Sequence, residues 1–227
     1  MKLQYLGHSF FRVLVNNFAI LIDPFINNTS TDEKYKSLVK CPVTEKNIPK
    51  ADVILISQEQ FDHFDKKAVE SIASRDNSVV VSHESVLREL SLPQNNLRPV
   101  SSGENFTLRG IEFEVVPAHR PQSFYPMGFL IKHNGKQLFY AGDTDLTDHF
   151  ARIKPDVALL PIGGNITMDV IDAVRATKTM KPKFAIPMHY DTFEIIKADP
   201  KDFKHRIEKS ILKTVPVILK PGEEFEF

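Results

Sequence analysis

Residues 52–63 read DVILISQEQFDH, and this stretch decides the fold. Its first five residues predict a buried strand, because aliphatic and β-branched side chains follow one another from Val53 to Ile56. Asp62 and His63 come just after that strand. In α/β proteins, functional side chains gather at the carboxyl ends of strands. The stretch therefore predicts an α/β architecture with a polar site at the end of this strand.

The composition allows a sizeable core and gives no sign of a nucleic-acid partner. The chain has 227 residues, enough for one large domain or two small ones, and 42% of them are hydrophobic. The formal net charge is zero at pH 7. Because nothing in this balance indicates a basic face, nucleic acid is not an expected partner.

Cysteine usage and the lack of long apolar runs indicate the compartment. Cys41 is the only cysteine, so no internal disulfide can form, as is usual in a reducing cytoplasm. Residues 1–5 lack the apolar run of a signal peptide, and no stretch approaches the roughly 20 apolar residues of a membrane span. We therefore expect a cytoplasmic protein with no membrane partner, and a homo-oligomer remains open.

Turn residues between apolar runs predict three hairpins. In the first, Asn16-Asn17 joins the two runs, and asparagine tolerates the positive φ of tight turns. The three predicted strand pairs are 10–15 with 18–22, 106–108 with 111–116, and 128–132 with 137–141. Single strands are predicted at 78–81, 157–160, 184–187 and 215–219. No regular element is predicted in the polar stretch 27–50.

Capping residues indicate where helices begin. Ser82 and Thr167 have side chains that can accept hydrogen bonds at a helix N-terminus, and Asp199-Pro200 combines a cap with a first-turn proline. The predicted helices cover 66–73, 82 to about 90, 169–177, and 199 to about 212. Two of these helices lie in each half of the chain.

The two halves of the sequence echo each other. In the first half a hairpin ends at Asp23 and a strand follows at 52–56, and in the second a hairpin ends at Asp143 and a strand follows at 157–160. Such a repeat favours a pseudo-duplicated sandwich, with two hairpin-rich sheets face to face and helices outside. The polar residues that follow the strands would then gather at one edge of the sandwich.

Five polar residues share a position just beyond the end of a predicted strand. They are Asp62, His63, His119, Asp143 and His189. Any one of these histidines alone would more often be structural. Three histidines and two carboxylates together match the ligands of a divalent metal ion. The joint pattern therefore predicts a metal site.

The motifs around these residues resemble those of a known family. The chain is similar to metallo-β-lactamase-fold proteins, and among them to small metal-dependent hydrolases that include the ascorbate-6-phosphate lactonase-like proteins. The motifs are Gly7-His8-Ser9 with Asp23-Pro24, Gly142-Asp143-Thr144, residues 160–164 (LPIGG), Thr167-Met168 with Asp172-Ala173, and residues 186–193 (IPMHYDTF). The resemblance covers most of the chain. It implies an α/β (α+β) fold, a four-layer αββα sandwich of the metallo-β-lactamase type, as a single domain over residues 1–227.

The resemblance also implies a ligand set. In the family, the motif His-x-His-x-Asp-His supplies two alternate histidines, which bind one metal ion together with a later histidine. Its Asp-His pair and a last histidine bind a second ion, and the aspartate of the Gly-Asp-Thr motif bridges both. The metal ligands implied here are Asp62, His63, Asp143, His189 and His119. Gln58 and Gln60 stand where the two alternate histidines would be.

The two glutamines weaken the first metal site. An amide oxygen is a poor zinc ligand compared with imidazole, and a closed zinc site uses about three or four good donors. Glu59 is not an expected replacement, because adjacent residues of an extended segment point in opposite directions. We therefore predict one divalent ion per chain rather than two. Zinc is the expected metal, with manganese, iron or nickel as alternatives.

The other site residues receive less direct roles. Asp62 and His119 are the expected catalytic residues, and His119, without a metal ion, can act as a base or hold the substrate. His8 and Tyr190 are candidates for contact with the substrate or with a metal ligand. Asp23 is a candidate for orienting a ligand histidine. A purely structural role is the alternative for His8 and for Asp23.

The predicted function is that of a metal-dependent hydrolase of a small ester, lactone or phosphodiester. The resemblance supplies this class, and its partner would be a small-molecule substrate. The alternative is a non-catalytic binding or regulatory protein that kept the fold, which Gln58 and Gln60 favour. A nuclease of the same fold is a third candidate. However, a chain of 227 residues with zero net charge leaves little room for the nucleic-acid-binding domain that those enzymes add.

Overall fold

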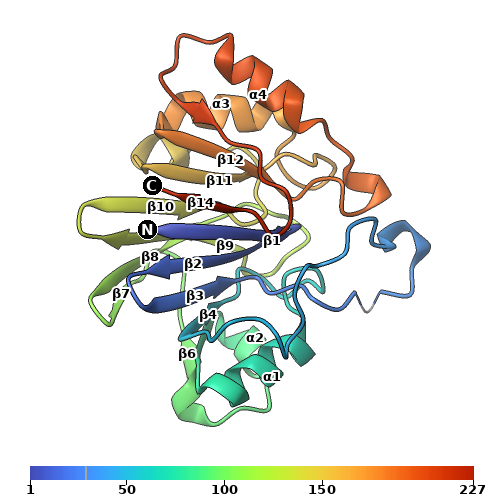
Figure 1. Ribbon diagram of the computed structural model, residues 1–227, viewed down its shortest axis with the longest axis vertical. Helices are drawn as coiled ribbons and strands as arrows, with labels where there is room; N and C mark the ends of the chain where they lie inside the picture. Colours follow the sequence, from blue (N-terminus) through green and yellow to red (C-terminus); the bar gives the residue numbers. More distant parts are fainter. Residues whose placement is uncertain (29) are drawn as a thin grey trace.

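Two seven-stranded sheets lie face to face in the computed structural model, and helices cover the outer face of each (Figure 1). The structure describes residues 1–28 and 30–227. Helices α1 and α2 lie on one side of the paired sheets, and α3 and α4 lie on the opposite side. The predicted four-layer αββα sandwich is thereby confirmed.

The first sheet contains strands from the N-terminal part of the chain and one strand from its C-terminal part. Its order is β14-β1-β2-β3-β4-β5-β6. The bounds are β1 Lys2–Gly7, β2 Phe10–Val15, β3 Phe18–Ile22, β4 Val53–Leu55, β5 Val79–Ser82, β6 Leu97–Pro99 and β14 Glu224–Glu226. Pairing is antiparallel from β14 to β3 and parallel from β3 to β6.

The second sheet repeats this change from antiparallel to parallel pairing. Its order is β13-β12-β11-β10-β9-β8-β7. The bounds are β7 Asn105–Leu108, β8 Ile111–Pro117, β9 Met127–His133, β10 Lys136–Tyr140, β11 Val157–Pro161, β12 Phe184–Met188 and β13 Val215–Pro216. Pairing is antiparallel from β7 to β10 and parallel from β10 to β13. The repeat predicted between the two halves of the chain is therefore present in the strand pairing of the two sheets.

Four α-helices and four short 3₁₀ helices complete the described elements. The α-helices are α1 Lys66–Asp76, α2 Glu84–Leu87, α3 Val170–Met180 and α4 Pro200–Glu208. The 3₁₀ helices are η1 Glu33–Tyr35, η2 Gln94–Asn96, η3 Asp148–Arg152 and η4 Glu194–Ile196. Asp65, Asp169 and Asp199 cap α1, α3 and α4 through their side chains.

Strand β4 shows why residues 52–56 form the centre of a layered fold. Val53 and Leu55 point into the core between the two sheets, whereas Ile54 and Ile56 pack in the layer beneath α1 and α2. All four side chains are buried. A strand that is covered on both faces needs a continuous apolar run rather than an alternating one. The sequence of this stretch therefore fits a central strand of a sandwich.

Several predicted element boundaries are wrong. The helix cap predicted at Ser82 belongs to His83, because Ser82 ends β5 and its hydroxyl donates to the Ile56 carbonyl; α2 then spans only four residues. The cap predicted at Thr167 belongs to Asp169, whose carboxylate accepts the amide of Asp172. Helix α4 ends at Glu208, short of the predicted end.

Three strands of the first sheet were not expected from the sequence, and one strand of the second is shorter than predicted. The unexpected strands are β1, β6 and β14. Strand β13 covers only Val215–Pro216 of the predicted 215–219. Among the described residues, no helix combines the length and the apolar character needed to cross a lipid bilayer.

Candidate metal centre

The candidate site is assembled from loops that follow strands of both sheets. His8 follows β1, and Asp62 and His63 follow β4 in the first sheet. Asp143 follows β10, and His189 follows β12 in the second sheet. The ends of these strands meet at one edge of the sandwich, so residues far apart in the sequence come together there.

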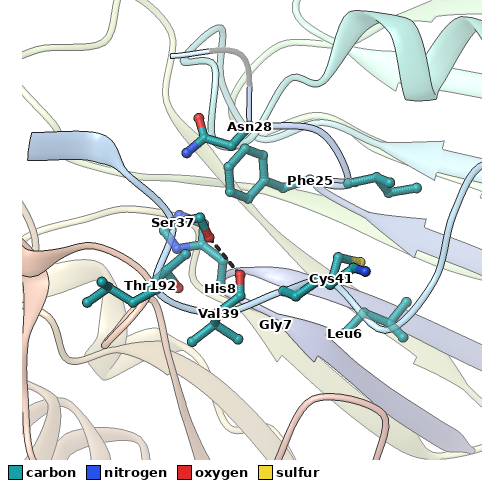
Figure 2. Close-up of a pocket in the computed structure, with 12 residues that line it drawn as sticks. Leu6, Gly7, His8, Phe25, Asn28, Ser37, Val39, Cys41 and Thr192 are labelled. Carbon is teal, nitrogen blue, oxygen red and sulfur yellow. Dashed lines mark hydrogen bonds between the residues drawn. The ribbon is translucent and has the colours of Figure 1, made fainter. Parts of the chain in front are cut away.

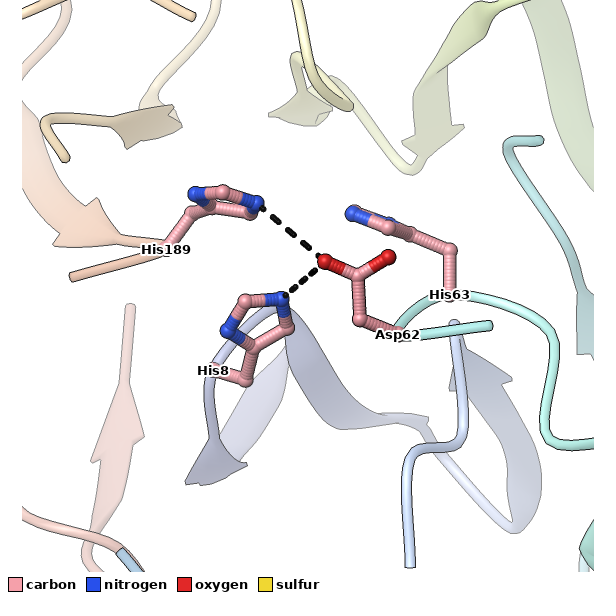
Figure 3. Close-up of side chains that lie close together, drawn as sticks. All are labelled: His8, Asp62, His63 and His189. Atoms are coloured by element: carbon pink, nitrogen blue, oxygen red, sulfur yellow. Dashed lines mark hydrogen bonds and ion pairs between the residues drawn. The ribbon is translucent and has the colours of Figure 1, made fainter. Parts of the chain in front are cut away.

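Four buried side chains form the centre of the site. His8, Asp62, His63 and His189 each offer one ligand atom, and these atoms all lie within 4.8 Å of one another. Figure 3 shows the three imidazoles and the carboxylate converging on a common point. Imidazole nitrogen and carboxylate oxygen are the donors that zinc and similar divalent ions prefer.

Asp62 lies between two of the histidines. Its Oδ2 lies 3.2 Å from His8 Nε2 and 3.8 Å from His189 Nε2. Burial by itself would raise the pKa of Asp62, but the neighbouring His63, His189 and His8 outweigh it and hold this pKa well below its usual value. The carboxylate is therefore ionised and available as a ligand.

Asp143 adds a second carboxylate to the group. Its Oδ2 lies 3.1 Å from His63 Nε2 and 3.0 Å from His189 Nε2. Neither nitrogen has a hydrogen-bond partner among residues 1–28 and 30–227, because the geometry of these contacts does not suit a hydrogen bond. Buried polar atoms are normally paired, so unpaired atoms that face one another indicate a missing ligand. The donor set therefore fits a divalent metal ion.

Asp23 fixes the orientation of His63. Its Oδ2 lies 2.7 Å from His63 Nδ1 and accepts the hydroxyl hydrogens of Ser57 and Tyr140, each at 2.5 Å. A proton on Nδ1 is held by this contact, which leaves the lone pair of Nε2 facing Asp143. The side chain of Asp23 is fully buried. Asp23 therefore holds His63 in an orientation that suits a metal ligand.

The backbone of two histidines is held in an uncommon conformation. His8 has φ of 55° and His189 has φ of 54°, both in the left-handed region. The His189 amide donates to the His8 carbonyl over 2.9 Å, so the two turns support each other. Strained backbone of this kind is concentrated at functional sites.

Burial favours the neutral form of His8 and His189. It lowers the pKa of His8 to about 3, with a further contribution from the neighbouring His189, and it also lowers the pKa of His189. A neutral imidazole has a free lone pair, which is the form that binds a metal ion. Phe25 and Phe193 lie against His8, with ring centroids at 5.5 and 5.3 Å, and contribute to this apolar environment.

The glutamines at the first-site positions do not face a common point. Gln58 is buried, and its Nε2 donates to Asp143 Oδ2 over 3.1 Å. Gln60 is only partly buried and donates to the Gln122 carbonyl over 3.1 Å. Glu59 points to the same loop, where it accepts the Ser123 hydroxyl. No imidazole-like donor set therefore forms from these three residues.

His119 lies outside the group. Its side chain is 64% exposed, and its Nδ1 lies 3.0 Å from Asp145 Oδ2. The next residue, Arg120, points inward instead: only 4% of its side chain is exposed, and its Nη1 donates to Asp143 Oδ2. Sequence reasoning missed Arg120. The available signal was that Gln58 and Gln60 left the Asp143 carboxylate short of cationic partners.

Two other predicted site residues have clear positions. His8 is 2% exposed, and one of its ring nitrogens is among the candidate ligand atoms of the metal group. Tyr190 packs against the core between the second sheet and its helices. Burial raises the pKa of Tyr190 to about 12, so its hydroxyl is protonated at neutral pH.

A cavity of about 350 Å³ lies beside His8 (Figure 2). Its lining is mixed: Phe25 supplies an aromatic face, and Asn28, Ser37 and Thr192 supply polar groups. Cys41 also lines it, but burial raises the pKa of this thiol to about 11, so it is not a nucleophile at neutral pH. The cavity therefore offers space for a small molecule next to the metal group.

Comparison with known proteins agrees with this geometry. The sequence-family model of the beta-lactamase superfamily domain matches residues 2–189 of the chain. A UPF0173 metal-dependent hydrolase of Archaeoglobus fulgidus is 34% identical to the chain, and the alignment covers 100% of the chain and 99% of the relative. The chain belongs to the UPF0173 family of metal-dependent hydrolases, within the metallo-β-lactamase superfamily.

Solved structures support the family and the fold. Igni18, a metallo hydrolase from the archaeon Ignicoccus hospitalis, is 35% identical to this chain and has a TM-score of 0.82. The match covers 100% of this chain and 98% of Igni18. An isothiocyanate hydrolase from Delia radicum gut bacteria has a TM-score of 0.83, with 100% of this chain and 99% of that chain covered. At 17% identity, this second likeness shows the shared fold alone.

Proposed function

We propose that this UPF0173 protein uses one divalent metal ion to hydrolyse a small ester, lactone or phosphodiester. The observation that carries the proposal is the buried convergence of Asp62, His63 and His189: Nε2 of both histidines and Oδ1 of Asp62 lack hydrogen-bond partners among the described residues. Such an ion lowers the pKa of a water molecule and polarises a carbonyl or phosphoryl oxygen. The relatives named metal-dependent hydrolases support the same class. Zinc is the proposed metal because the donors are imidazole and carboxylate.

The residues of the site have different roles in binding the ion. Asp62, His63 and His189 would bind it, with Asp143 facing the same point and His8 beside Asp62. Asp23 keeps the proton of His63 on Nδ1. His119 has no place in this ligand set because its side chain faces solvent, and we assign it no role as a ligand or a base.

The cavity beside His8 supports a small-molecule substrate. A volume of about 350 Å³ is at the lower end of the range for small-molecule sites. Phe25 and Phe193 cover the adjoining side of His8 and exclude water from it. Asn28, Ser37 and Thr192 provide the few polar groups that would orient an ester or a phosphodiester. The zero net charge gives no support to a nucleic-acid substrate.

A panel of carboxylic esters, lactones and phosphodiesters tests the proposal. The protein is loaded separately with zinc, manganese, iron or nickel, and initial rates are compared with those of Asp62→Asn and His189→Ala. We expect rates to fall at least about a hundredfold in both variants, because each loses a metal ligand. His205→Ala, which changes an exposed histidine on α4, should match the wild type. Activity that survives both ligand substitutions would refute the proposal.

One observation favours a non-catalytic binding protein instead. Gln58 and Arg120 both donate to Asp143, so part of the site is closed by the protein's own side chains. A binding protein would take up the metal ion and show no turnover with any substrate of the panel. If Gln58→His with Gln60→His then gained turnover, this second function would be favoured over hydrolysis.

A further inference from the structure

We propose that the Arg120 guanidinium takes the place of the family's first metal ion, as a fixed cation on Asp143 that confines the protein to one divalent ion. The inference rests on the metal site proposed above at Asp62, His63 and His189. It goes further by assigning a role to Arg120 and by explaining why residues 58–60 differ from the motif His-x-His.

Arg120 contacts the residue that would bridge two ions. Its side chain is 4% exposed, and Nη1 donates to Asp143 Oδ2. The same oxygen lies 3.1 Å from His63 Nε2 and 3.0 Å from His189 Nε2. A buried guanidinium is tolerated only when it is paired, and here the partner is a buried carboxylate. Asp143 is thus shared between the candidate metal position and a cation of the protein itself.

Gln58 presents the wrong group to a metal ion at the first site. Its Nε2 donates a hydrogen bond to Asp143 Oδ2 over 3.1 Å. The imidazole that the family motif places there would present a lone pair to the metal. An N–H donor beside a carboxylate stabilises the negative charge without binding a cation. Through this N–H, Gln58 supports the Asp143 carboxylate as Arg120 does, while its buried Oε1 has no hydrogen-bond partner among the described residues.

Glu59 and Gln60 hold the loop that carries Arg120. The Glu59 carboxylate accepts the Ser123 hydroxyl over 2.8 Å and the Phe124 amide over 3.0 Å. Gln60 donates to the Gln122 carbonyl over 3.1 Å. These contacts fix residues 122–124, which are separated from Arg120 only by Pro121. The stretch 58–60 thus serves the placement of Arg120.

The start of the same loop turns His119 outward. The His119 amide donates to Thr144 Oγ1 over 2.9 Å, and the His119 carbonyl accepts the Asp145 amide over 2.9 Å. Its imidazole lies beside Asp145 in solvent. Because neighbouring residues of an extended segment point to opposite sides, this anchoring directs Arg120 inward. The first site thereby exchanges its third histidine for a guanidinium.

The buried charges agree with one ion and not with two. Asp23, Asp62 and Asp143 are buried carboxylates, and Arg120 is a buried cation. These three carboxylates and one guanidinium leave two negative charges, which a single divalent ion balances. A second divalent ion would leave two uncompensated positive charges in a buried site, which is strongly unfavourable.

Metal counting on four proteins tests the inference. Each is stripped of metal, incubated with excess zinc, passed through a desalting column and analysed for bound zinc by mass spectrometry. The proteins are the wild type, Gln58→His with Gln60→His, the same pair with Arg120→Ala, and the same pair with Arg98→Ala. We expect two zinc ions per chain in the variant that combines the two histidines with Arg120→Ala. We expect one zinc ion per chain in each of the other three proteins. Arg98 is the matched control because it pairs with Glu104 outside the metal group.

The outcomes separate this inference from the proposed function. Two ions in the paired histidine variant with Arg120 in place would overturn the role of Arg120, and so would a single ion after Arg120→Ala. A wild type that binds no zinc would instead refute the metal centre itself. Because no rate is measured, the absence of hydrolysis does not affect the count.

A second measurement applies if the multiple variants do not fold. Arg120→Gln removes the charge that neutralises Asp143 in the metal-free protein. We expect the rise in Tm on adding zinc to be larger in Arg120→Gln than in the wild type, and zinc affinity to increase on the order of tenfold. Arg120→Lys keeps the charge and should restore the wild-type rise. Arg98→Gln should not change it, and an unchanged rise in Arg120→Gln would contradict the inference.

Discussion

His63, a candidate metal ligand, is oriented by a single buried carboxylate. Asp23 Oδ2 lies 2.7 Å from His63 Nδ1. The hydroxyl groups of Ser57 and Tyr140 donate hydrogen bonds to the same oxygen and hold the carboxylate in place. Substitution of a residue that hydrogen-bonds a metal ligand typically lowers metal affinity about 10- to 100-fold. At the residue scale, therefore, the site extends beyond the atoms that would touch the ion.

Substitution of Asp23 tests this dependence. In Asp23→Asn the amide can present an N–H to His63 Nδ1, which favours the tautomer with its proton on Nε2 and so blocks the lone pair. We expect zinc affinity, measured by competition with a chelating dye, to fall about 10- to 100-fold. Asp52→Asn is the control, since its carboxylate accepts the Ala19 amide at the far end of β4. Unchanged affinity in Asp23→Asn would show that His63 needs no orientation.

The neutral histidines predict how stability depends on pH. The pKa of His8 is lowered to about 3 in the folded protein, whereas in the unfolded chain it would be about 6.5. Between these values the unfolded state binds more protons, so stability is complete above about pH 6.5 and is lost as the pH falls toward 3. His8 alone contributes a slope of about 1.4 kcal/mol per pH unit in this window.

Urea unfolding of the metal-free protein between pH 7.5 and about 4.5 measures this slope. We expect His8→Gln to give a shallower decline of the free energy of unfolding than the wild type. His205→Gln changes an exposed histidine and should leave the decline unchanged. Equal slopes in His8→Gln and the wild type would mean that His8 is not held neutral.

Sequence reasoning located some site residues better than others. Asp62, His63, Asp143 and His189 were placed together because each follows a strand, and strand ends of paired layers meet at one edge. The choice between His119 and Arg120 could not be made in this way. Which of two neighbours points inward depends on the hydrogen bonds of the loop to Thr144 and Asp145, and these contacts are not local in sequence.

At the scale of elements, the end of β12 is fixed by close contact with the loop after β11. Gly163 has no side chain, and a Cβ placed there would lie 2.3 Å from the His189 carbonyl oxygen and 3.0 Å from Ile196 Cβ. The glycine therefore allows the backbone that carries His189 to approach β11 closely. This packing positions a ligand through the backbone rather than through a side chain.

Gly163→Ala is expected to displace His189. The added methyl group cannot fit unless the backbone at His189 moves, so zinc affinity should fall about tenfold or more. Gly103→Ala is a suitable control for general destabilisation, since its Cβ meets no atom within 4 Å but its φ of +85° is strained. Calorimetric titration with zinc and thermal unfolding separate the two effects. A Gly163→Ala protein that binds zinc as the wild type does would contradict this role.

Elements with strong local signals were predicted well, and those that depend on distant partners were not. The hairpin of β2 and β3 turns at Asn16, whose φ of 55° matches the predicted tight turn. By contrast, β14 is three residues long and forms only because β1 offers an edge at the other end of the chain. Helix α2, which is capped by His83 and contacts β5 and β6, is only four residues long, from Glu84 to Leu87.

At the scale of the whole molecule, two similar halves place one metal group between them. Each half contains antiparallel strands followed by parallel ones, and helices cover each outer face (Figure 1). The halves are not equivalent at the site: Asp23 orients a ligand from behind, whereas Asp143 faces the ligands directly. Pairing of β1 with β14 also brings the two ends of the described chain together in the first sheet.

An anomalous-scattering map of crystals grown with zinc tests the central claim most directly. We predict one peak per chain, about 2.0–2.2 Å from the ligand atoms of Asp62, His63 and His189, with the Arg120 guanidinium still on Asp143. Two peaks per chain, or a peak where the guanidinium now lies, would contradict a single ion beside a fixed cation.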